Sequence, residues 1–446
     1  MGTPDGSALK RRLGTFDAVT IGLGSMIGAG VFSAFAPAAA AAGSGLMIGL
    51  VLAAGVAYCN AVASAQLAAQ YPTSGGTYIY GRERLGEWWG FLAGFGFVVG
   101  KTASCAAMAI TFGAYVVPGS EWGRRVAAFA AVVVLTGANL RGISRTARLA
   151  RVLVAASLVA LAVVVGAIVL GDHTSSSHIG SVFAHGGVYG VLQAAGLLFF
   201  AFAGYARIAT LGEEVRDPAR TIPRAIPLAL GITVVLYLVV GVAALAAAGP
   251  AVLAGSHAPV AAAVRAAGAA WSVPVVRVGA AVASLGSLLA LIAGIGRTTL
   301  AMARNGDLPR GLAVVEERRQ VPARAELAVA GVVALLVVTT DLRGAIGFSS
   351  FGVLLYYAVA NASAFTQDAP HRRWPRALNV AGLMGCLTLV ATLPVVSVAA
   401  GVAVLLVGVC LRALLRRGTA GTSRGTRRTA RSPAHSPSSR LRSPGR

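Results

Sequence analysis

The sequence predicts an all-α polytopic membrane protein, and three observations carry this prediction. Of the 446 residues, 56% are hydrophobic and 12% are charged, and the mean hydropathy is +0.75. Soluble domains carry roughly twice that share of charge, about 25%. The apolar residues gather in repeated runs of about 18 or more, and each run could cross a hydrocarbon core of roughly 30 Å as a helix. Short polar or proline-containing breaks separate the runs.

The apolar runs define about twelve predicted membrane spans, and the last two are divided only around Pro394. We expect the spans at residues 17–40, 45–70, 87–118, 124–140, 147–170, 188–213, 224–248, 274–302, 324–341, 345–367, 377–393 and 395–411. They form one membrane domain over residues 13–411. A short polar segment, 1–12, precedes this domain, and a basic tail, 412–446, follows it.

The distribution of cations predicts the orientation of the chain. Cytoplasmic loops carry the excess of Lys and Arg. With the N-terminus inside, most loop cations fall on one side, and the other side receives only Arg124, Arg125, Arg265, Arg277 and Arg343. We therefore expect both termini in the cytoplasm and the chain in the cell (inner) membrane. No cleaved signal peptide is indicated before the first span.

The formal charge of +23 raises the alternative of nucleic acid binding. Position argues against it, because much of the charge lies in the tail and in loops on one side of the helices. The tail is polar and Pro-rich, a composition typical of disorder. A lipid-surface or solvated role is favoured over nucleic acid.

Neither cofactor nor metal is predicted. The four cysteines lie within apolar runs without metal-ligand spacing, so we expect them to be small buried hydrophobic residues. They are Cys59, Cys105, Cys386 and Cys410. The histidines between residues 171 and 187 are loosely spaced in a polar loop. The chain also has no Walker loop, nucleophile elbow or His-Glu-x-x-His motif, so no enzyme is predicted.

The first span is interrupted by glycine. Gly22, Gly24, Gly28 and Gly30 fall within nine residues of a hydrophobic segment, and each glycine weakens a helix by about 1 kcal/mol relative to alanine. Open backbone in a membrane is tolerated only where it lines a cavity or packs against protein. Close packing of the Gly-x-x-x-Gly kind is the alternative, whereas the spacing does not fit a dinucleotide loop.

A second interruption lies in the sixth span, at Phe202-Ala203-Gly204. Paired interruptions in corresponding positions of two halves are the best sequence indication of the binding site in an inverted-repeat transporter. Half-helix N-termini there face an anionic group and freed carbonyls face a cation. The pair therefore predicts a zwitterionic ligand with one carboxylate and one ammonium.

Four ordered motifs resemble the amino acid-polyamine-organocation superfamily of permeases. The resemblance runs from about Leu13 to Gln367 and rests on Gly24-Ser25-Met26-Ile27-Gly28-Ala29-Gly30-Val31-Phe32, Tyr71-Pro72-Thr73-Ser74-Gly75-Gly76-Thr77-Tyr78, Glu213-Glu214-Val215-Arg216-Asp217-Pro218 and Ala301-Met302-Ala303-Arg304-Asn305-Gly306-Asp307-Leu308-Pro309. It implies a five-plus-five inverted repeat, spans 1–5 and 6–10, with helices 1 and 6 interrupted and alternating access.

The resemblance also implies which residues bind the substrate. The amides of Met26, Ile27, Gly28, Ala29 and Gly30 would hold the carboxylate, and the carbonyls of Phe202, Ala203 and Gly204 would hold the ammonium. Phe200 matches an aromatic gating position of some relatives.

The chain departs from the family pattern in two places. Some cationic exchangers carry a carboxylate where Ala206 stands, and no acidic residue lies deep in any predicted span, which disfavours arginine or polyamine substrates. Several relatives place a coupling lysine in the fifth span, which is apolar here after Arg151.

Lys101 in the third span is the candidate substitute. A lysine at membrane depth is expensive and functional by default, although a snorkelling or carbonyl-paired structural lysine is the alternative. For Arg207 we expect a fixed electrostatic role or an ion pair with Glu213 or Glu214. Ser284 and Ser287 could line a sodium position, but small hydroxyls in helix packing are commoner.

These observations predict secondary active transport of amino acids, with uptake coupled to protons. An exchanger of amino acids or polyamines is the alternative within transport, and a non-transporting receptor or sensor is the weaker alternative. The carried amino acid and the oligomeric state are not predicted.

Overall fold

A computed structural model describes residues 13–73, 75–141, 147–171, 173–175, 178, 186–316 and 321–426. Within these ranges the regular structure is helical, and no strand is formed beyond two isolated β-bridges. The predicted N-terminal segment 1–12 and residues 427–446 of the predicted tail lie outside the described residues.

The helices follow the order of the predicted spans. They are α1 (Thr15–Met26), α2 (Ala29–Ser33), α3 (Phe35–Ala42), α4 (Leu46–Gln70), α5 (Thr77–Leu85), α6 (Glu87–Val116), α7 (Glu121–Leu140), α8 (Ala147–Val169), α9 (Gly187–Phe202), α10 (Ala206–Ala209), α11 (Pro218–Gly255), α12 (Pro259–Ala266), α13 (Val273–Arg304), α14 (Ala323–Thr339), α15 (Leu342–Phe365), α16 (Arg376–Thr392) and α17 (Val395–Thr426).

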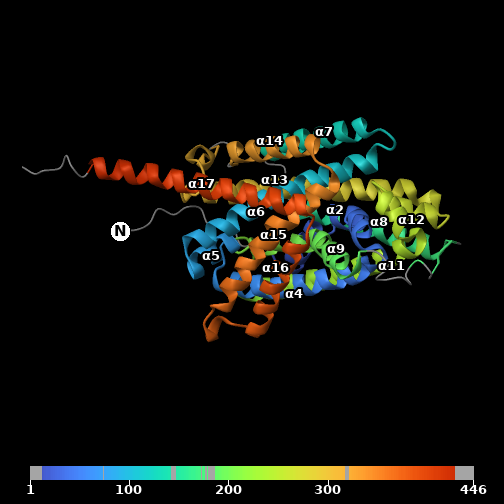
Figure 1. Cartoon of the computed structure of the whole chain (residues 1–446), viewed down its shortest axis with the longest axis horizontal. Coiled ribbons are helices and arrows are strands. Elements are labelled where there is room, and N and C mark those ends of the chain that lie inside the picture. The colour runs from blue at the N-terminus through green and yellow to red at the C-terminus, as the bar shows by residue number, and fades with distance from the viewer. Residues whose placement is uncertain are drawn as a thin grey trace, which may run out of the picture.

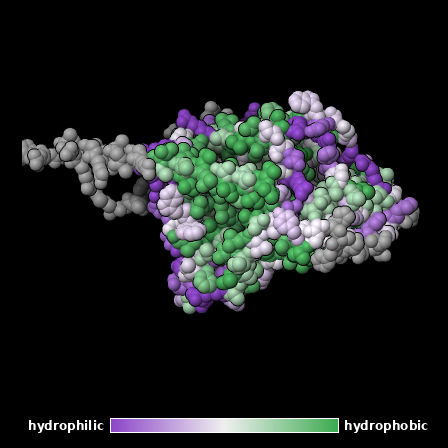
Figure 2. Space-filling model, viewed as in Figure 1, coloured by the Kyte–Doolittle hydropathy of each residue, from purple (hydrophilic) through white to green (hydrophobic). Residues whose placement is uncertain are grey.

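The all-α polytopic membrane class is confirmed, whereas the number of spans is not. In the described residues, 10 segments are long and apolar enough to cross a membrane. The ninth and eleventh predicted spans correspond to α14 and α16, which have 17 residues each and are shorter than those segments. Figure 2 shows hydrophobic residues covering the middle of the visible face, with hydrophilic residues gathered toward its two ends.

The helices form one bundle whose centre holds the interrupted segments. α6 packs against α13 and α15, and α4 packs against α9, α11 and α15. α7 and α14 lie together along one edge, while α17 runs along the outside (Figure 1). The largest hydrophobic core cluster includes Met26, Phe202 and Tyr237. The breaks in the first and sixth spans are therefore enclosed by protein.

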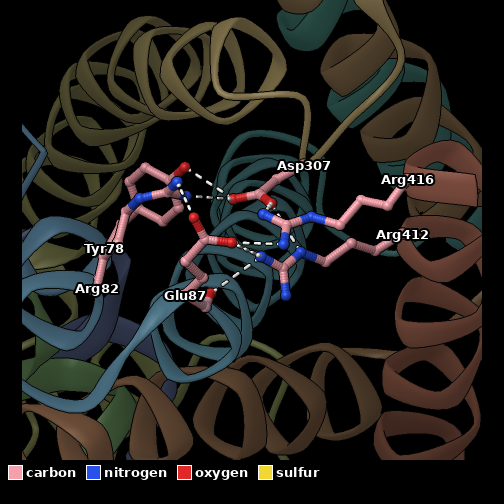
Figure 3. Close-up of polar contacts among 6 residues, drawn as sticks. All are labelled: Tyr78, Arg82, Glu87, Asp307, Arg412 and Arg416. Atoms are coloured by element: carbon pink, nitrogen blue, oxygen red, sulfur yellow. Dashed lines mark hydrogen bonds and ion pairs between the residues drawn. The ribbon is translucent and has the colours of Figure 1, made fainter. Parts of the chain in front are cut away.

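An ionic cluster fastens α17 to the end of the bundle that carries α5 (Figure 3). The Asp307 carboxylate accepts from Arg412 Nε at 2.7 Å and from Tyr78 Oη at 2.8 Å. Arg82 and Arg416 lie between Asp307 and Glu87 and contact both carboxylates. Asp307 and Arg412 are both fully buried.

Arg412 belongs to the packed part of α17, beyond the predicted end of the membrane domain. The predicted membrane domain ends at residue 411, but α17 continues to Thr426. Arg412 also lies over the Trp88 ring, with its guanidinium carbon 4.2 Å from the ring centroid. The first residue assigned to the tail is thus part of the packed bundle.

Candidate functional site

The first break lies between α1 and α2, where Ile27 and Gly28 leave the helix. Gly28 has φ −46° and ψ −132°, so the chain turns before α2 begins at Ala29. A Cβ atom on Gly28 would lie 2.0 Å from Ser287 Oγ of α13. The glycine at this position therefore allows α13 to approach the break. The predicted interruption at Met26 to Gly30 is observed.

The second break lies between α9 and α10. The α-helix ends at Phe202, a single 3₁₀ turn covers Ala203–Tyr205, and α10 begins at Ala206. A tighter turn of this type leaves carbonyls without the usual helical partner. The Ala203 carbonyl in this turn accepts a hydrogen bond from another helix. This interruption also falls where the sequence predicts it.

The two breaks touch each other through backbone. A Cβ atom on Gly204 would lie 2.3 Å from the Ser25 carbonyl oxygen and 2.6 Å from the Met26 nitrogen. A Cβ on Gly30 would lie 2.7 Å from the Cα of Ala201. Glycines at 30 and 204 thus let the interrupted segments of the first and sixth spans come into direct contact.

Tyr237 of α11 connects the same two segments. Its hydroxyl donates to the Met26 carbonyl and lies 3.1 Å from the Ala201 carbonyl. Its ring packs on Phe202 at a centroid distance of 5.2 Å. The hydroxyl has only one proton, so the two carbonyls share it. Tyr237 was not singled out from the sequence, because a tyrosine in an apolar run gives no pattern of its own.

Lys101 of α6 lies at the second break. Its ammonium nitrogen donates to the Ala203 carbonyl at 2.9 Å, and the residue is 4% exposed. A charged side chain at the bilayer centre costs about 2.5–3.5 kcal/mol on insertion scales, and a charge-assisted hydrogen bond offsets part of that cost. The structure thus brings together the coupling candidate and one of the carbonyls expected to bind the substrate.

A cavity of ≈ 40 Å³ adjoins Lys101 and the second break. Its lining includes Ala203, Gly204, Arg207 and Thr210 from the sixth span and Phe97 from α6. α13 closes the other side with Ala290, Leu291, Gly294, Ile295, Arg297 and Thr298. Since a water needs about 10–15 Å³ of such volume, the space fits roughly three waters. Even glycine, with five heavy atoms, would not fit without movement of the walls.

The α13 face of this cavity was missed by the sequence analysis. Gly294, Arg297 and Thr298 are spaced i, i+3 and i+4, so they share one side of the helix. An arginine and a threonine on that side of an apolar span could have indicated that this side faces a polar space. Phe97 lies four residues before Lys101, so the same helical spacing could have placed it beside Lys101.

Charged side chains line this cavity and lie beside it. Arg207 Nη1 donates to Thr210 Oγ1 at 3.2 Å. Glu214, one of its expected partners, instead lies 3.4 Å from Arg297 Nη1. The cavity therefore carries Lys101 and Arg207 beside an Arg297–Glu214 ion pair, and its lining is positively charged.

Other predicted site residues lie around the breaks but outside this cavity lining. Phe200 and Phe202 are buried, at 6% and 0% exposure. Met26 and Ile27 are also buried, and Ala29 begins α2. The hydroxyl of Ser287 donates to the Gly24 carbonyl at 2.9 Å, in a second cavity that also includes Arg207. Ser284 does not line that second cavity.

Comparison with known proteins agrees with this architecture. The family model described as "Amino acid permease" matches residues 13–412. The chain belongs to the amino acid permease family. It is a multi-pass membrane transporter and not an enzyme, as the sequence predicts.

Relatives of this permease extend over most of its length. It is 61% identical to an uncharacterised transporter of Mycobacterium tuberculosis over 421 residues, 94% of each chain. A branched-chain amino acid permease of Bacillus subtilis is 26% identical over 92% of this chain and 94% of its own. A methylthioribose transporter of the same species is 29% identical over 80% of each chain.

Proposed function

We propose that this permease takes up amino acids across the cell (inner) membrane by secondary active transport with alternating access. The observation that carries the proposal is the hydrogen bond between Lys101 and Ala203 at a break in the sixth span. Family membership supplies the substrate class. The contact of two interrupted segments at backbone level supports a site for a small zwitterion between them.

The substrate would bind chiefly to backbone groups. Amides of Met26 to Gly30 would hold its carboxylate, and carbonyls of Phe202 to Gly204 would hold its ammonium. Phe200, buried on α9, would form part of the aromatic gate. Since backbone groups recognise what all amino acids share, this arrangement leaves side-chain selection to the α13 wall of the cavity.

The small size of that cavity supports alternating access as part of the proposal. A space that fits roughly three waters must enlarge before an amino acid can enter or leave. The short helices next to the breaks are α2, with five residues, and α10, with four. In this proposal they move when the cavity enlarges. In the proposed cycle, the two five-span halves move relative to each other, and the substrate site between them opens alternately to the two sides of the membrane.

Proton coupling would act through Lys101. A carbonyl oxygen has two lone pairs, so Ala203 can accept from Lys101 and still accept from a substrate ammonium. Protonated Lys101 holds the 3₁₀ turn in the arrangement seen here, and the neutral amine would hold it less strongly. Substrate binding would then be favoured by the protonated form, which couples uptake to the proton gradient.

The orientation of the chain is part of the proposal. Arg82, Arg412 and Arg416 meet in one cluster at the α5 end of the bundle, whereas Arg124 and Arg125 line a cavity with His257. The excess of arginine at the α5 end supports a cytoplasmic location for that end. Both termini would then be cytoplasmic.

Uptake into proteoliposomes tests the proposal. The purified full chain would be given a panel of labelled amino acids, with and without an inward proton gradient. We expect uptake of at least one amino acid, increased by the gradient. No uptake under either condition would overturn the transport proposal, and gradient-independent uptake would overturn the coupling alone.

A further inference from the structure

A basic cavity lies between the end of α13 and α17. It has a volume of ≈ 430 Å³, and its lining includes Arg304, Arg310 and Arg416. Arg304 ends α13, Arg310 begins the 3₁₀ turn Arg310–Ala313, and Arg416 projects from α17. Three arginines from three elements therefore line one space.

The neighbouring carboxylates are already occupied. Asp307 is held by Arg412, Arg82 and Arg416, and Glu87 is shared by Arg82 and Arg416 as well (Figure 3). Arg304 and Arg310 are exposed and form no ion pair within the described parts of the chain. The cavity thus has positive charge that these carboxylates do not neutralise.

An apolar groove meets the basic cavity at Leu308, which lines both. The groove has a volume of ≈ 600 Å³ and runs between α6, α14, α15 and α17. Its walls include Val98, Leu312, Val332, Leu336, Phe348 and Val404. This volume is within the range of ligand sites, about 300–1,000 Å³. A polar space and an apolar one are therefore adjacent at Leu308.

Two tryptophans indicate the depth of the basic cavity in the membrane. Trp88 and Trp89, at the start of α6, are 45% and 50% exposed. Tryptophan is enriched at the level of the lipid headgroups. Trp88 contacts Arg412, one turn before Arg416 on α17. The arginines would therefore lie at headgroup level, with the groove leading into the hydrocarbon layer.

We propose that this composite site binds one anionic phospholipid. The phosphate lies among Arg304, Arg310 and Arg416, and one acyl chain follows the groove past Leu308. Guanidinium groups match phosphate oxygens in geometry and charge, and basic pockets between membrane helices are suited to anionic headgroups. The site is separate from the amino acid site and does not depend on its assignment.

Bound lipid would contact the back of the transport site. Thr102 and Ala103, which follow Lys101 on α6, line the groove, and so does Thr299, which follows Thr298 on α13. An acyl chain there would pack against the helical turns that carry Lys101 and Thr298. We therefore expect the lipid to stabilise the α6–α13 pair.

Thermal unfolding in detergent tests the headgroup half of the site. Phosphatidylglycerol should raise the Tm of the full chain by at least about 2 °C more than an equal amount of phosphatidylcholine. The double variant Arg304→Gln/Arg310→Gln should lose at least half of this difference. The control Arg220→Gln/Arg224→Gln removes the same amount of charge from the start of α11 and should keep the full Tm difference between the two lipids. Equal responses to the two lipids, or equal losses in the two variants, would overturn the proposal.

Two further arms separate lipid from free phosphate and test the groove. Inorganic phosphate should not reproduce the Tm rise. If phosphate does raise the Tm, and Arg304→Gln/Arg310→Gln abolishes that rise, the site binds a free anion instead of a lipid. Ala400→Trp fills the groove, whereas Ala399→Trp changes the adjacent exposed position outside its lining. Only Ala400→Trp should remove the phosphatidylglycerol response, and an unchanged response would exclude the acyl chain from the groove.

Discussion

The Lys101 ammonium donates to the Ala203 carbonyl across a distance of 2.9 Å, and this contact joins α6 to the break in the sixth span. The two partners of this contact were predicted by separate sequence arguments. One concerns the cost of a lysine at membrane depth, and the other concerns the position of glycine in a hydrophobic helix. The contact also fits the alternative of a carbonyl-paired structural lysine, and the response of uptake to a proton gradient distinguishes that role from coupling.

Replacement of Lys101 separates these roles. In Lys101→Ala, the Ala203 carbonyl loses a charge-assisted hydrogen bond worth about 1.5–3 kcal/mol. We expect the stimulation of uptake by a proton gradient to disappear, with a rise in KM of about tenfold or more. Gradient-stimulated and gradient-independent uptake into proteoliposomes give the measurement. Full gradient-dependent uptake in this variant would remove Lys101 from the coupling mechanism.

Tyr237→Phe should weaken the connection between the two breaks. The change removes one hydroxyl and leaves the carbonyls of Met26 and Ala201 without this donor, at a cost of about 1–3 kcal/mol. We expect a lower Tm and a higher KM for the transported amino acid. Tyr58→Phe, at a 45% exposed position, is the matched control and should change neither.

Gly204→Ala should abolish transport by a steric effect. The new methyl group would lie 2.3 Å from the Ser25 carbonyl oxygen, so the interrupted segments would have to separate. Gly231→Ala provides the control, because its added Cβ meets no atom within 4 Å beyond the neighbouring backbone of its own helix, and alanine favours the helix. Uptake in the control should match that of the natural chain. Equal activity of the two variants would argue against backbone contact between the breaks.

The ionic cluster predicts a large effect of Asp307→Asn. Removing one partner of a buried ion pair costs about 3–5 kcal/mol, because the other charge remains buried. We expect a clear loss of Tm and of folded protein after purification. The exposed pair Arg220–Asp217 offers a comparison, since Asp217→Asn should cost at most about 1 kcal/mol.

Tyr78 predicts a change of stability at alkaline pH. Burial, together with the nearby Asp307 carboxylate, raises the pKa of Tyr78 to about 12. The neutral phenol is thus favoured in the folded state, so its stabilising contribution is complete below pH 10 and is lost as the pH rises toward 12. Tyr78→Phe should flatten the dependence of Tm on pH in this window. An unchanged alkaline slope would contradict this role.

Much of the fold follows from the sequence because each membrane span is a local pattern. The breaks at Gly28 and Gly204 were also predicted, since glycine inside an apolar run is visible without knowledge of its neighbours. The predicted number of spans is not confirmed, because α14 and α16 have 17 residues each and are shorter than the 10 segments that could cross a membrane in the described residues.

Contacts between distant parts of the chain could not be predicted in this way. Tyr237 meets Met26 and Ala201 only after three spans have packed, and no spacing in the sequence marks that meeting. Arg412 begins a basic segment, so its composition indicated a solvated tail. Its partner Asp307 lies 105 residues earlier, and only the folded bundle brings the two together.

The Asp307–Arg412 ion pair has a practical consequence for anyone shortening this chain. A truncation at residue 411, where the apolar run ends, would delete Arg412 and Arg416 and leave a buried carboxylate with weaker partners. Such a protein should aggregate or purify poorly, and this failure could be mistaken for a requirement for the basic tail. A stop codon placed after Arg416 would retain the cluster and give a fair test of what the remaining tail contributes.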